Sequence, residues 1–393
     1  MKANALYIQS GGPTSVINSS AYGVIQECRK HKDVIDKLYA VENGTVGLLQ
    51  DKLIDIDDIT EEDIELLKQT PSMAFGSCRY FVKEASDYNQ IIEVLKRHNI
   101  HYILLNGGNG TVRACKDMLD YFESKHFDCQ IVVIPKTVDN DISCIDHAPG
   151  FPSAARHVVL SVSELAHDLR TYDTGLIMTA EVMGRNTGFL AASCILPIQD
   201  GNGPDLIYFP EVVFDPEKFV KDVNRVYQEK GKCFAVVAEG VKTKEGKFLF
   251  EMAENWTVEN PQQNMGGISD YLHRLLVKNF NCKIRCIDIG LMQRCAIHDA
   301  SQIDIDEAIE VGEAAVKAIV NGANGVMISI IRDSSNPYQK HLEQIPVKEI
   351  VKKDATLPLA YLNDEQNFIR DEFADYIRPL VGKMPKYTKI RRK

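Results

Sequence analysis

The sequence has no run of about 18 apolar residues, so we expect no transmembrane helix. Its first residues, MKANALYIQSGG, lack the apolar segment and cleavage site of a signal peptide. The ten cysteines form no C-x-x-C pair, and Cys282 and Cys286 have no matching Cys/His pair at zinc-site spacing. These absences argue against a membrane-spanning, a disulfide-stabilised or a zinc-binding protein. They predict reduced thiols in a cytoplasmic protein.

Positive charge is also scarce, because 45 Lys and Arg face 55 Asp and Glu, for a net charge of −10. This balance argues against nucleic acid or an anionic membrane as the main partner. It leaves room for a small anionic ligand, since a few converging arginines reverse the field locally. The basic run KYTKIRRK (386–393) is interpreted as a solvated tail.

The chain contains neither G-x-x-x-x-G-K-[ST] nor G-x-G-x-x-G, so an ordinary P-loop and a dinucleotide site are excluded. No repeat of solenoid period is visible either. With 393 residues, 45% of them hydrophobic, the chain is long enough for two domains with their own cores.

Short apolar runs typical of strands alternate with longer runs at helical spacing. The expected helices are 187–196, 216–230, 261–280 and 304–321, with two more after the glycine-rich loops at 10–14 and 107–111. The expected strands are 5–9, 101–106, 131–134, 176–182, 206–209, 233–239, 283–289 and 325–331. This alternation predicts an α/β protein with two lobes of mostly parallel sheet flanked by helices. Ligands of such sheets bind beyond the carboxyl ends of the strands, so we expect the active site there, between the lobes.

Three polar loops follow predicted strands and should meet at that edge. SGGPT (10–14) and GGNGT (107–111) place glycines between a strand and a helix, where backbone N–H groups can approach an anion. Each is weak evidence alone, because Gly-Gly turns are common. Two such loops on one sheet edge favour phosphate binding.

The third loop, PKTVDND (135–141), contains a cation and two carboxylates. Phosphoryl transfer to a hydroxyl needs a base, for which Asp139 is the candidate. It also needs a cation for the developing charge and a hard oxygen ligand for Mg²⁺, roles that suit Lys136 and Asp141. A strand-end turn capped by aspartates is the simpler alternative. EVMGRNTGFLAA (181–192) favours the chemical interpretation, because Arg185 lies at a predicted helix start where it can face a phosphate.

Seven motifs together resemble the phosphofructokinases, in the order found in that family and over residues 10–330. They are SGGPTSVIN (10–18), GSCR (76–79), GGNGT (107–111), PKTVDND (135–141), EVMGR (181–185), AEG (238–240) and QR (293–294). The tail LPLAYLNDEQNFIRDEFADYIRPLVG (357–382) is similar to the C-terminal extension of the pyrophosphate-dependent members.

The resemblance implies Mg²⁺-dependent transfer of a phosphoryl group to the 1-hydroxyl of fructose 6-phosphate in glycolysis. It makes Asp139, Lys136 and Arg185 catalytic and assigns Asn109 and Asp141 to the metal. The implied donor-binding residues are Gly12, Arg79, Gly108, Gly110 and Lys136. The implied substrate-binding residues are Thr137, Asp139, Met183, Gly184, Arg185, Glu239, Arg285, Leu291 and Arg294. Arg285 would reach the substrate of a neighbouring subunit, which implies a homodimer or homotetramer.

The donor residues are mixed. Lys136 stands where ATP-dependent members usually have glycine, and a lysine there fills the space of an ATP α-phosphate and adds charge for a compact diphosphate. Gly110, however, is the residue typical of ATP-dependent members. We predict pyrophosphate as the donor, because the lysine acts directly and the C-terminal extension agrees.

Other departures concern the metal and the acceptor. Asn109 replaces an aspartate of many members, which leaves more of the metal binding to Asp141 and the donor oxygens. Leu176 and Leu291 replace polar residues for the 6-phosphate, and two lost contacts weaken affinity by about 2–4 kcal/mol if nothing replaces them. A different acceptor therefore stays open.

We therefore predict a reversible pyrophosphate:fructose-6-phosphate 1-phosphotransferase. The alternatives are an ATP-dependent phosphofructokinase, a kinase of another sugar or sugar phosphate such as sedoheptulose 7-phosphate, and a catalytically silent subunit that binds sugar phosphate and regulates a partner. We expect a donor and metal lobe of residues 1–150 plus about 293–345, a sugar-phosphate lobe of 151–292 and a C-terminal extension of 346–393.

Overall fold

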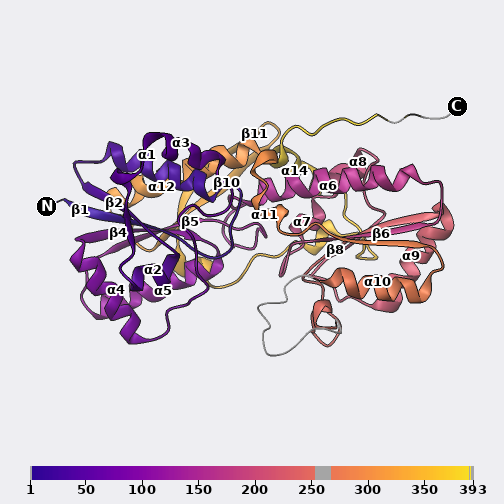
Figure 1. Cartoon of the computed structure of the whole chain (residues 1–393), viewed down its shortest axis with the longest axis horizontal. Coiled ribbons are helices and arrows are strands. Elements are labelled where there is room, and N and C mark those ends of the chain that lie inside the picture. Colours follow the sequence, from indigo (N-terminus) through magenta and orange to yellow (C-terminus); the bar gives the residue numbers. More distant parts are fainter. Residues whose placement is uncertain (1, 253–266, 389, 391–393) are drawn as a thin grey trace.

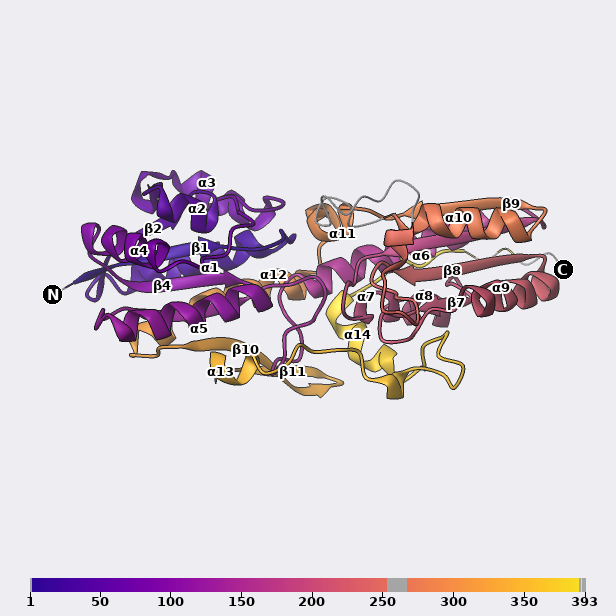
Figure 2. The ribbon, with the colours of Figure 1, turned by 90° about the horizontal axis from the view of Figure 1, so that it is seen from below.

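Two α/β lobes lie side by side along the long axis of the molecule, each built on its own sheet (Figures 1 and 2). The structure is a computed structural model that describes residues 2–252, 267–388 and 390. No helix of these described residues is long and apolar enough to cross a membrane. The predicted two-lobed α/β architecture is confirmed.

The first lobe holds a seven-stranded sheet of order β11-β10-β5-β4-β1-β2-β3. Its inner strands are parallel, whereas β3 and β11 pair antiparallel at the two edges. The strands are β1 (Ala3–Gln9), β2 (Ile35–Val41), β3 (Leu53–Asp55), β4 (Ile100–Gly107), β5 (Gln130–Pro135), β10 (Val326–Ser335) and β11 (Tyr338–Pro346). The edge strands were missed because β11 is largely polar and β3 has only three residues, and neither is fully buried. β2 was missed as well, because its polar residues interrupt the apolar run.

Helices cover both faces of this sheet. One face packs against α1 (Ile17–Lys30) and α12 (Gln302–Val320). The other packs against α2 (Gly44–Leu49), α4 (Ala85–Arg97), α5 (Asn109–Ser124) and α13 (Val347–Ile350). Helix α3 (Glu61–Leu66) contributes Ile64 to the first of these cores.

The second lobe holds a four-stranded parallel sheet of order β7-β8-β6-β9. Its strands are β6 (Leu176–Val182), β7 (Leu206–Tyr208), β8 (Lys232–Ala238) and β9 (Lys283–Asp288). One face packs against α6 (Phe151–Thr171), α7 (Phe189–Ala192), α8 (Ile195–Gln199) and α14 (Phe373–Val381). The other packs against α9 (Pro216–Lys230) and α10 (Ile268–Asn279).

Two helix predictions need correction. The single helix expected at 187–196 is two short helices, α7 and α8. Pro197 has no N–H to donate to the Ser193 carbonyl, and proline is tolerated only in the first turn of a helix, so a new helix begins just before it. The helix expected at 261–280 is α10, and residues 261–266 of that prediction lie outside the described residues.

The segment after β11 runs from the first lobe to the second and completes the second lobe's core. Leu357, Phe373, Ile377 and Leu380 are buried in that core, and α14 packs on α6. Short helices occupy the remaining connections: α11 (Met292–Cys295) and the 3-10 turns Ile56–Asp58, Leu67–Gln69, Leu249–Met252, Ile297–Asp299 and Leu359–Tyr361.

Candidate active site

The three predicted loops meet at the carboxyl edge of the first sheet, because β1, β4 and β5 are neighbours there. The Lys136 ammonium donates to the Gly12 carbonyl at 2.6 Å, and the Lys136 backbone N–H donates to Gly107 at 3.0 Å. The GSCR segment joins them, since the Ser77 hydroxyl donates to the Gly11 carbonyl at 2.9 Å. The predicted proximity of these loops is confirmed.

Lys136 is the buried cation of this cluster, with only 3% of its surface exposed. Burial lowers its pKa to about 8, although the carboxylates of Asp141 and Asp139 oppose the shift and Arg294 adds to it. A bound polyanion would restore the charged form, because it replaces the water that the ammonium has lost. Lys136 is therefore suited to hold an anion beside Gly11 and Gly12.

A tight turn carries the two aspartates. The Thr137 hydroxyl accepts a hydrogen bond from the Asp139 backbone N–H at 3.1 Å and donates to an Asp141 carboxylate oxygen at 3.0 Å. Between them, Asn140 has a left-handed backbone with φ +58°. Asparagine tolerates this conformation better than most residues, which is why the chain can reverse here.

Asp139 has the electrostatics of a general base that works near neutral pH. Burial, together with the nearby negative charges of Asp141 and Glu239, raises its pKa to about 7, against the opposing charges of Lys136 and Arg185. A base is most effective when its pKa lies near the working pH. The backbone carbonyl of Asp139 also accepts from the Thr187 hydroxyl at 2.6 Å, which ties the turn to the second lobe.

Asn109 and Asp141 lie beside each other at the first turn of α5. The Asn109 side-chain N–H group donates to the Asp141 backbone carbonyl at 2.9 Å. This bond leaves the Asn109 amide oxygen and one Asp141 carboxylate oxygen available. These are hard ligands of the kind Mg²⁺ prefers, and Mg²⁺ commonly needs only one or two carboxylates when a phosphate supplies the rest. The residues therefore fit Mg²⁺, although the described part of the chain has no cluster of three or more metal-binding side chains.

The second lobe contributes the loop after β6. The Met183 N–H donates to the Gln293 side chain at 2.8 Å. Gly184 has φ +129° and no room for a side chain, because a Cβ would lie 2.4 Å from the Thr187 carbonyl oxygen. Arg185 is exposed, with its guanidinium 5.4 Å from the centre of the Phe248 ring. Burial raises the pKa of Glu239 to about 7, and Glu181 adds to the shift.

The structure places two predicted acceptor residues, Arg285 and Leu291, and the departure at Leu176 as follows. Arg285 is exposed on the edge strand β9, Leu291 is 61% exposed, and Leu176 is buried at the amino end of β6. Leu176 is five residues from Glu181, or about 16 Å along an extended strand. Leu176 therefore lies at the opposite end of β6 from the loop that carries Met183 and Arg185.

Arg294 lies on the donor side, with a guanidinium nitrogen 3.8 Å from the position of a Cβ on Gly12. Gly110 is covered by Phe81, a residue outside all the predicted motifs, whose ring lies 3.3 Å from the position of a Cβ on Gly110. Gly108 begins α5 next to the Lys136 carbonyl, and Arg79 is exposed two residues before Phe81.

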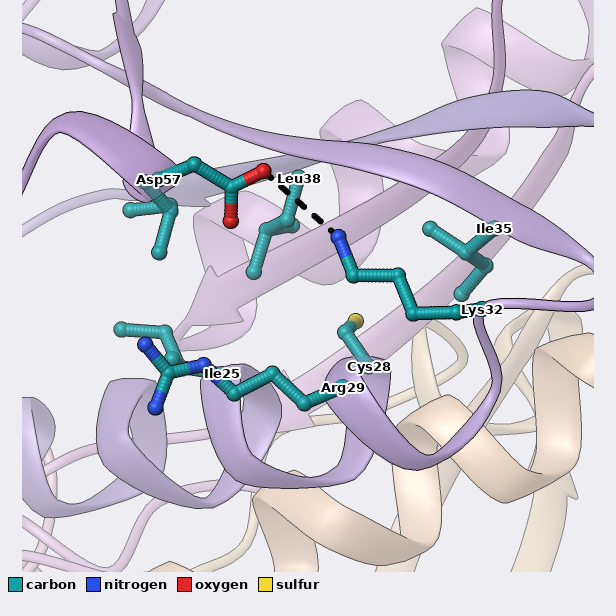
Figure 3. A pocket seen from close by; sticks show the side chains of 8 residues that line it. Ile25, Cys28, Arg29, Lys32, Ile35, Leu38 and Asp57 are labelled. Atoms are coloured by element: carbon teal, nitrogen blue, oxygen red, sulfur yellow. Dashed lines mark ion pairs between the residues drawn. The ribbon is translucent and has the colours of Figure 1, made fainter.

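Sequence reasoning also missed Thr187 and Gln293 as supports of the site. Both belong to motifs that it had singled out, but polar residues that bond backbone groups have no periodicity to reveal them. A small pocket under α1 is a separate feature, closed by Lys32 and Asp57 at 3.6 Å (Figure 3). None of the predicted site residues lines it.

Comparison with known proteins gives consistent matches. The phosphofructokinase family model matches residues 4–319. A pyrophosphate--fructose 6-phosphate 1-phosphotransferase of Halomonas elongata is 35% identical over 385 residues, which cover 96% of this chain and 91% of that protein. The crystal structure of a pyrophosphate-dependent phosphofructokinase from Marinobacter aquaeolei has a TM-score of 0.87 at 32% identity, covering 99% of this chain and 94% of that one. A sulfofructose kinase of Alkalicoccus urumqiensis is 32% identical over 364 residues, 92% of each chain.

Proposed function

The chain belongs to the phosphofructokinase family, and we propose that it transfers a phosphoryl group from pyrophosphate to the 1-hydroxyl of fructose 6-phosphate. The products are fructose 1,6-bisphosphate and phosphate. One observation carries the choice of donor: the Lys136 ammonium is buried against the Gly12 carbonyl, at the loops that face the donor. A cation fixed there suits a compact diphosphate.

The reaction follows from the charges of the turn. The 1-hydroxyl oxygen forms a bond to the terminal phosphorus as the bridging P–O bond breaks, and the bridging oxygen leaves with phosphate. Asp139 accepts the hydroxyl proton, and Lys136 and Arg185 offset the negative charge on the transferring group. The reaction should be close to reversible, because donor and product are phosphate compounds of similar transfer potential.

Asp141 and Asn109 would hold Mg²⁺ through their free side-chain oxygens. When bound, the ion neutralises charge on the phosphate oxygens. The Thr137 hydroxyl orients the Asp141 carboxylate for this role, since it already occupies one of its oxygens at 3.0 Å.

A second acceptor deserves the same assay. Leu176 and Leu291 are apolar where polar contacts to a 6-phosphate were expected, and a sulfofructose kinase is 32% identical to this chain over 92% of its length. An acceptor with another anionic group is therefore the principal alternative to fructose 6-phosphate.

We also propose the assignment of roles to the lobes. The donor and the metal would bind to a lobe of residues 1–150 and about 293–345. The sugar phosphate would bind to a lobe of residues 151–292, and the C-terminal extension would be residues 346–393. A homodimer or homotetramer would let the exposed Arg285 reach a neighbouring subunit's substrate. The ten free cysteines support a reducing, cytoplasmic location.

A coupled assay with saturating Mg²⁺ tests the proposal. We expect kcat/KM with pyrophosphate and fructose 6-phosphate to exceed the value with ATP by at least about 100-fold, the scale of one charge contact to a transferring phosphoryl group. Equal or better use of ATP would refute the donor assignment. Faster turnover of another sugar with pyrophosphate would refute the acceptor alone.

A further inference from the structure

The C-terminal segment, residues 354–384, contacts the turn that carries the two aspartates. The Ala355 N–H donates to the Asp141 backbone carbonyl at 2.8 Å. From α14, the hydroxyl of Tyr376 accepts from the Asn140 side-chain amide at 2.9 Å. A segment more than 200 positions later in the chain thus contacts two consecutive residues of the turn.

Asn140 depends on these contacts because its side chain is 3% exposed. Its amide oxygen accepts from the Ala148 N–H at 3.1 Å, which leaves the amide N–H group for Tyr376. A buried donor without a partner costs about 1–3 kcal/mol. The left-handed backbone of Asn140 (φ +58°) is also less stable than the usual regions, so side-chain bonds help to keep it.

Tyr376 is itself held rigidly. Its hydroxyl donates to the Asp146 backbone carbonyl at 2.8 Å. The Arg332 guanidinium lies 4.6 Å from its ring centre, donates to its carbonyl at 3.0 Å, and pairs with the Asp146 carboxylate at 2.9 Å. Its ring also packs against Phe151, Phe189 and Phe373. The hydroxyl therefore offers Asn140 a fixed point.

We propose that Tyr376 is a positioning residue for phosphoryl transfer. Through Asn140 it holds the turn in the conformation that presents Asp139 and Asp141. Tyr376 acts through another residue, so it affects the geometry of the reacting groups rather than the capture of substrates. The predicted effect on kcat rests on the proposed function. The predicted effect on the conformation of the turn rests on the hydrogen bonds alone.

The variant Tyr376→Phe removes one hydroxyl and keeps the ring. We expect kcat to fall about tenfold, since small displacements of catalytic groups have large effects on rate, while KM for pyrophosphate and fructose 6-phosphate stays within about twofold. Tyr361→Phe is the matched control, because its ring packs on Phe373 in the same segment and it does not contact Asn140. Its kcat should equal the wild-type value.

A double-mutant cycle separates positioning from general destabilisation. Asn140→Gly keeps the left-handed backbone, which glycine adopts freely, and removes the amide. We expect it to lower kcat about as much as Tyr376→Phe, and the double variant to lose no more than either single one. If Tyr376→Phe does not fold, an unchanged kcat in Asn140→Gly overturns the proposal and a tenfold loss supports it.

Hydrogen exchange gives a readout that does not depend on the reaction. Backbone amides of residues 136–142 should exchange at least about tenfold faster in Tyr376→Phe than in Tyr361→Phe. If the wild type does not use pyrophosphate and fructose 6-phosphate, the proposed function fails while this comparison still decides the positioning role. Equal exchange in both variants, a KM effect without a kcat effect, or additive losses in the cycle would each overturn it.

Discussion

At the scale of single residues, the turn at 136–141 concentrates the chemistry. Lys136 and Asp139 have pKa values displaced toward neutrality, Lys136 downward and Asp139 upward, chiefly because both are buried. Neither shift was foreseeable from the motif, which supplies residue types but not their burial. The shifts place a proton acceptor that titrates near neutral pH and a buried cation within one loop.

Replacing Asp139 by Asn should remove the base and little else. We expect kcat to fall by about 10²–10⁴, the usual contribution of a positioned base, with KM values nearly unchanged. Steady-state kinetics of the folded variant would measure this. A variant with more than a third of the wild-type turnover would assign the base to another residue.

The pKa of Asp139 also predicts a pH dependence. The ionised carboxylate is the active form, so kcat/KM should decrease as pH falls below about 7. Cations bound beside the carboxylate favour ionisation and would move this limb to lower pH. Because the pKa of Glu239 is also about 7, the Glu239→Gln variant is the control: it should keep the acid limb that Asp139→Asn loses, shifted toward lower pH because the negative charge of Glu239 no longer raises the pKa of Asp139.

The Lys136→Gly variant tests the donor. It removes the buried ammonium from the Gly12 carbonyl and opens the space beside Gly11, so pyrophosphate activity should fall by about 100-fold or more. Measurable ATP activity should appear in the same variant. Phe81→Ala is an informative companion, since the ring lies against Gly110 and clearing it should raise ATP activity further. If ATP activity stays at the wild-type level in both variants, Lys136 and Phe81 do not determine the choice of donor.

At the scale of elements, the close crossing of α1 and α12 supports the first sheet behind the site. A Cβ on Gly312 would lie 2.3 Å from the Ser20 carbonyl oxygen, and a Cβ on Gly23 would lie 2.1 Å from that of Ile309. Only glycine permits this approach, and both opposing atoms are backbone, so they cannot move aside as a side chain would. The helical periodicity of 304–321 predicted α12, but it did not indicate that α12 packs against α1.

Gly312→Ala should therefore destabilise the protein although alanine favours helices. Overpacking of this kind typically lowers the free energy of unfolding by about 1–3 kcal/mol. Denaturant unfolding against Gln302→Ala, an exposed position of the same helix, measures the difference. A Gly312→Ala variant as stable as that control would mean that the helices separate at little cost.

At the scale of the whole molecule, a buried charged cluster lies in the first lobe next to the C-terminal segment, whose Tyr376 hydroxyl donates to the Asp146 carbonyl. His147 lies between Asp146 and Glu307, at 2.7 Å from each carboxylate, and Tyr338 donates to Glu307 at 2.6 Å. Burial alone would lower the pKa of His147, but the two carboxylates outweigh it and raise the pKa to about 9. The cluster therefore keeps an imidazolium at neutral pH.

This raised pKa predicts how stability changes with pH. A group whose folded pKa lies above its unfolded value near 6.5 stabilises fully below pH 6.5. That contribution is lost as pH rises toward about 9. Thermal unfolding midpoints should thus decrease over this range, and His147→Gln should flatten the decrease. A wild-type midpoint that rises between pH 6.5 and 9 would contradict a charged His147.

The sequence by itself determined the α/β class, the two lobes and the order of the loops at the site. Strand periodicity and local motifs are properties of neighbouring residues, so PKTVDND, GGNGT and EVMGR were readable before any fold was known. Parallel-sheet topology then required the loops SGGPT, GGNGT and PKTVDND to meet at one edge of the sheet. The motifs that identify the family needed only their order along the chain.

Tertiary structure alone decided what depends on distant partners. Tyr376 reaches Asn140 from 236 positions away, Phe81 covers Gly110, and Leu176 lies in the core at the far end of β6. The largely polar β11 and the three-residue β3 form because a neighbouring strand offers hydrogen bonds, and neither has a fully buried face that would signal it in the sequence. The pKa values of Lys136, Asp139 and His147 belong here too, because burial and opposing charge arise only when the chain has folded.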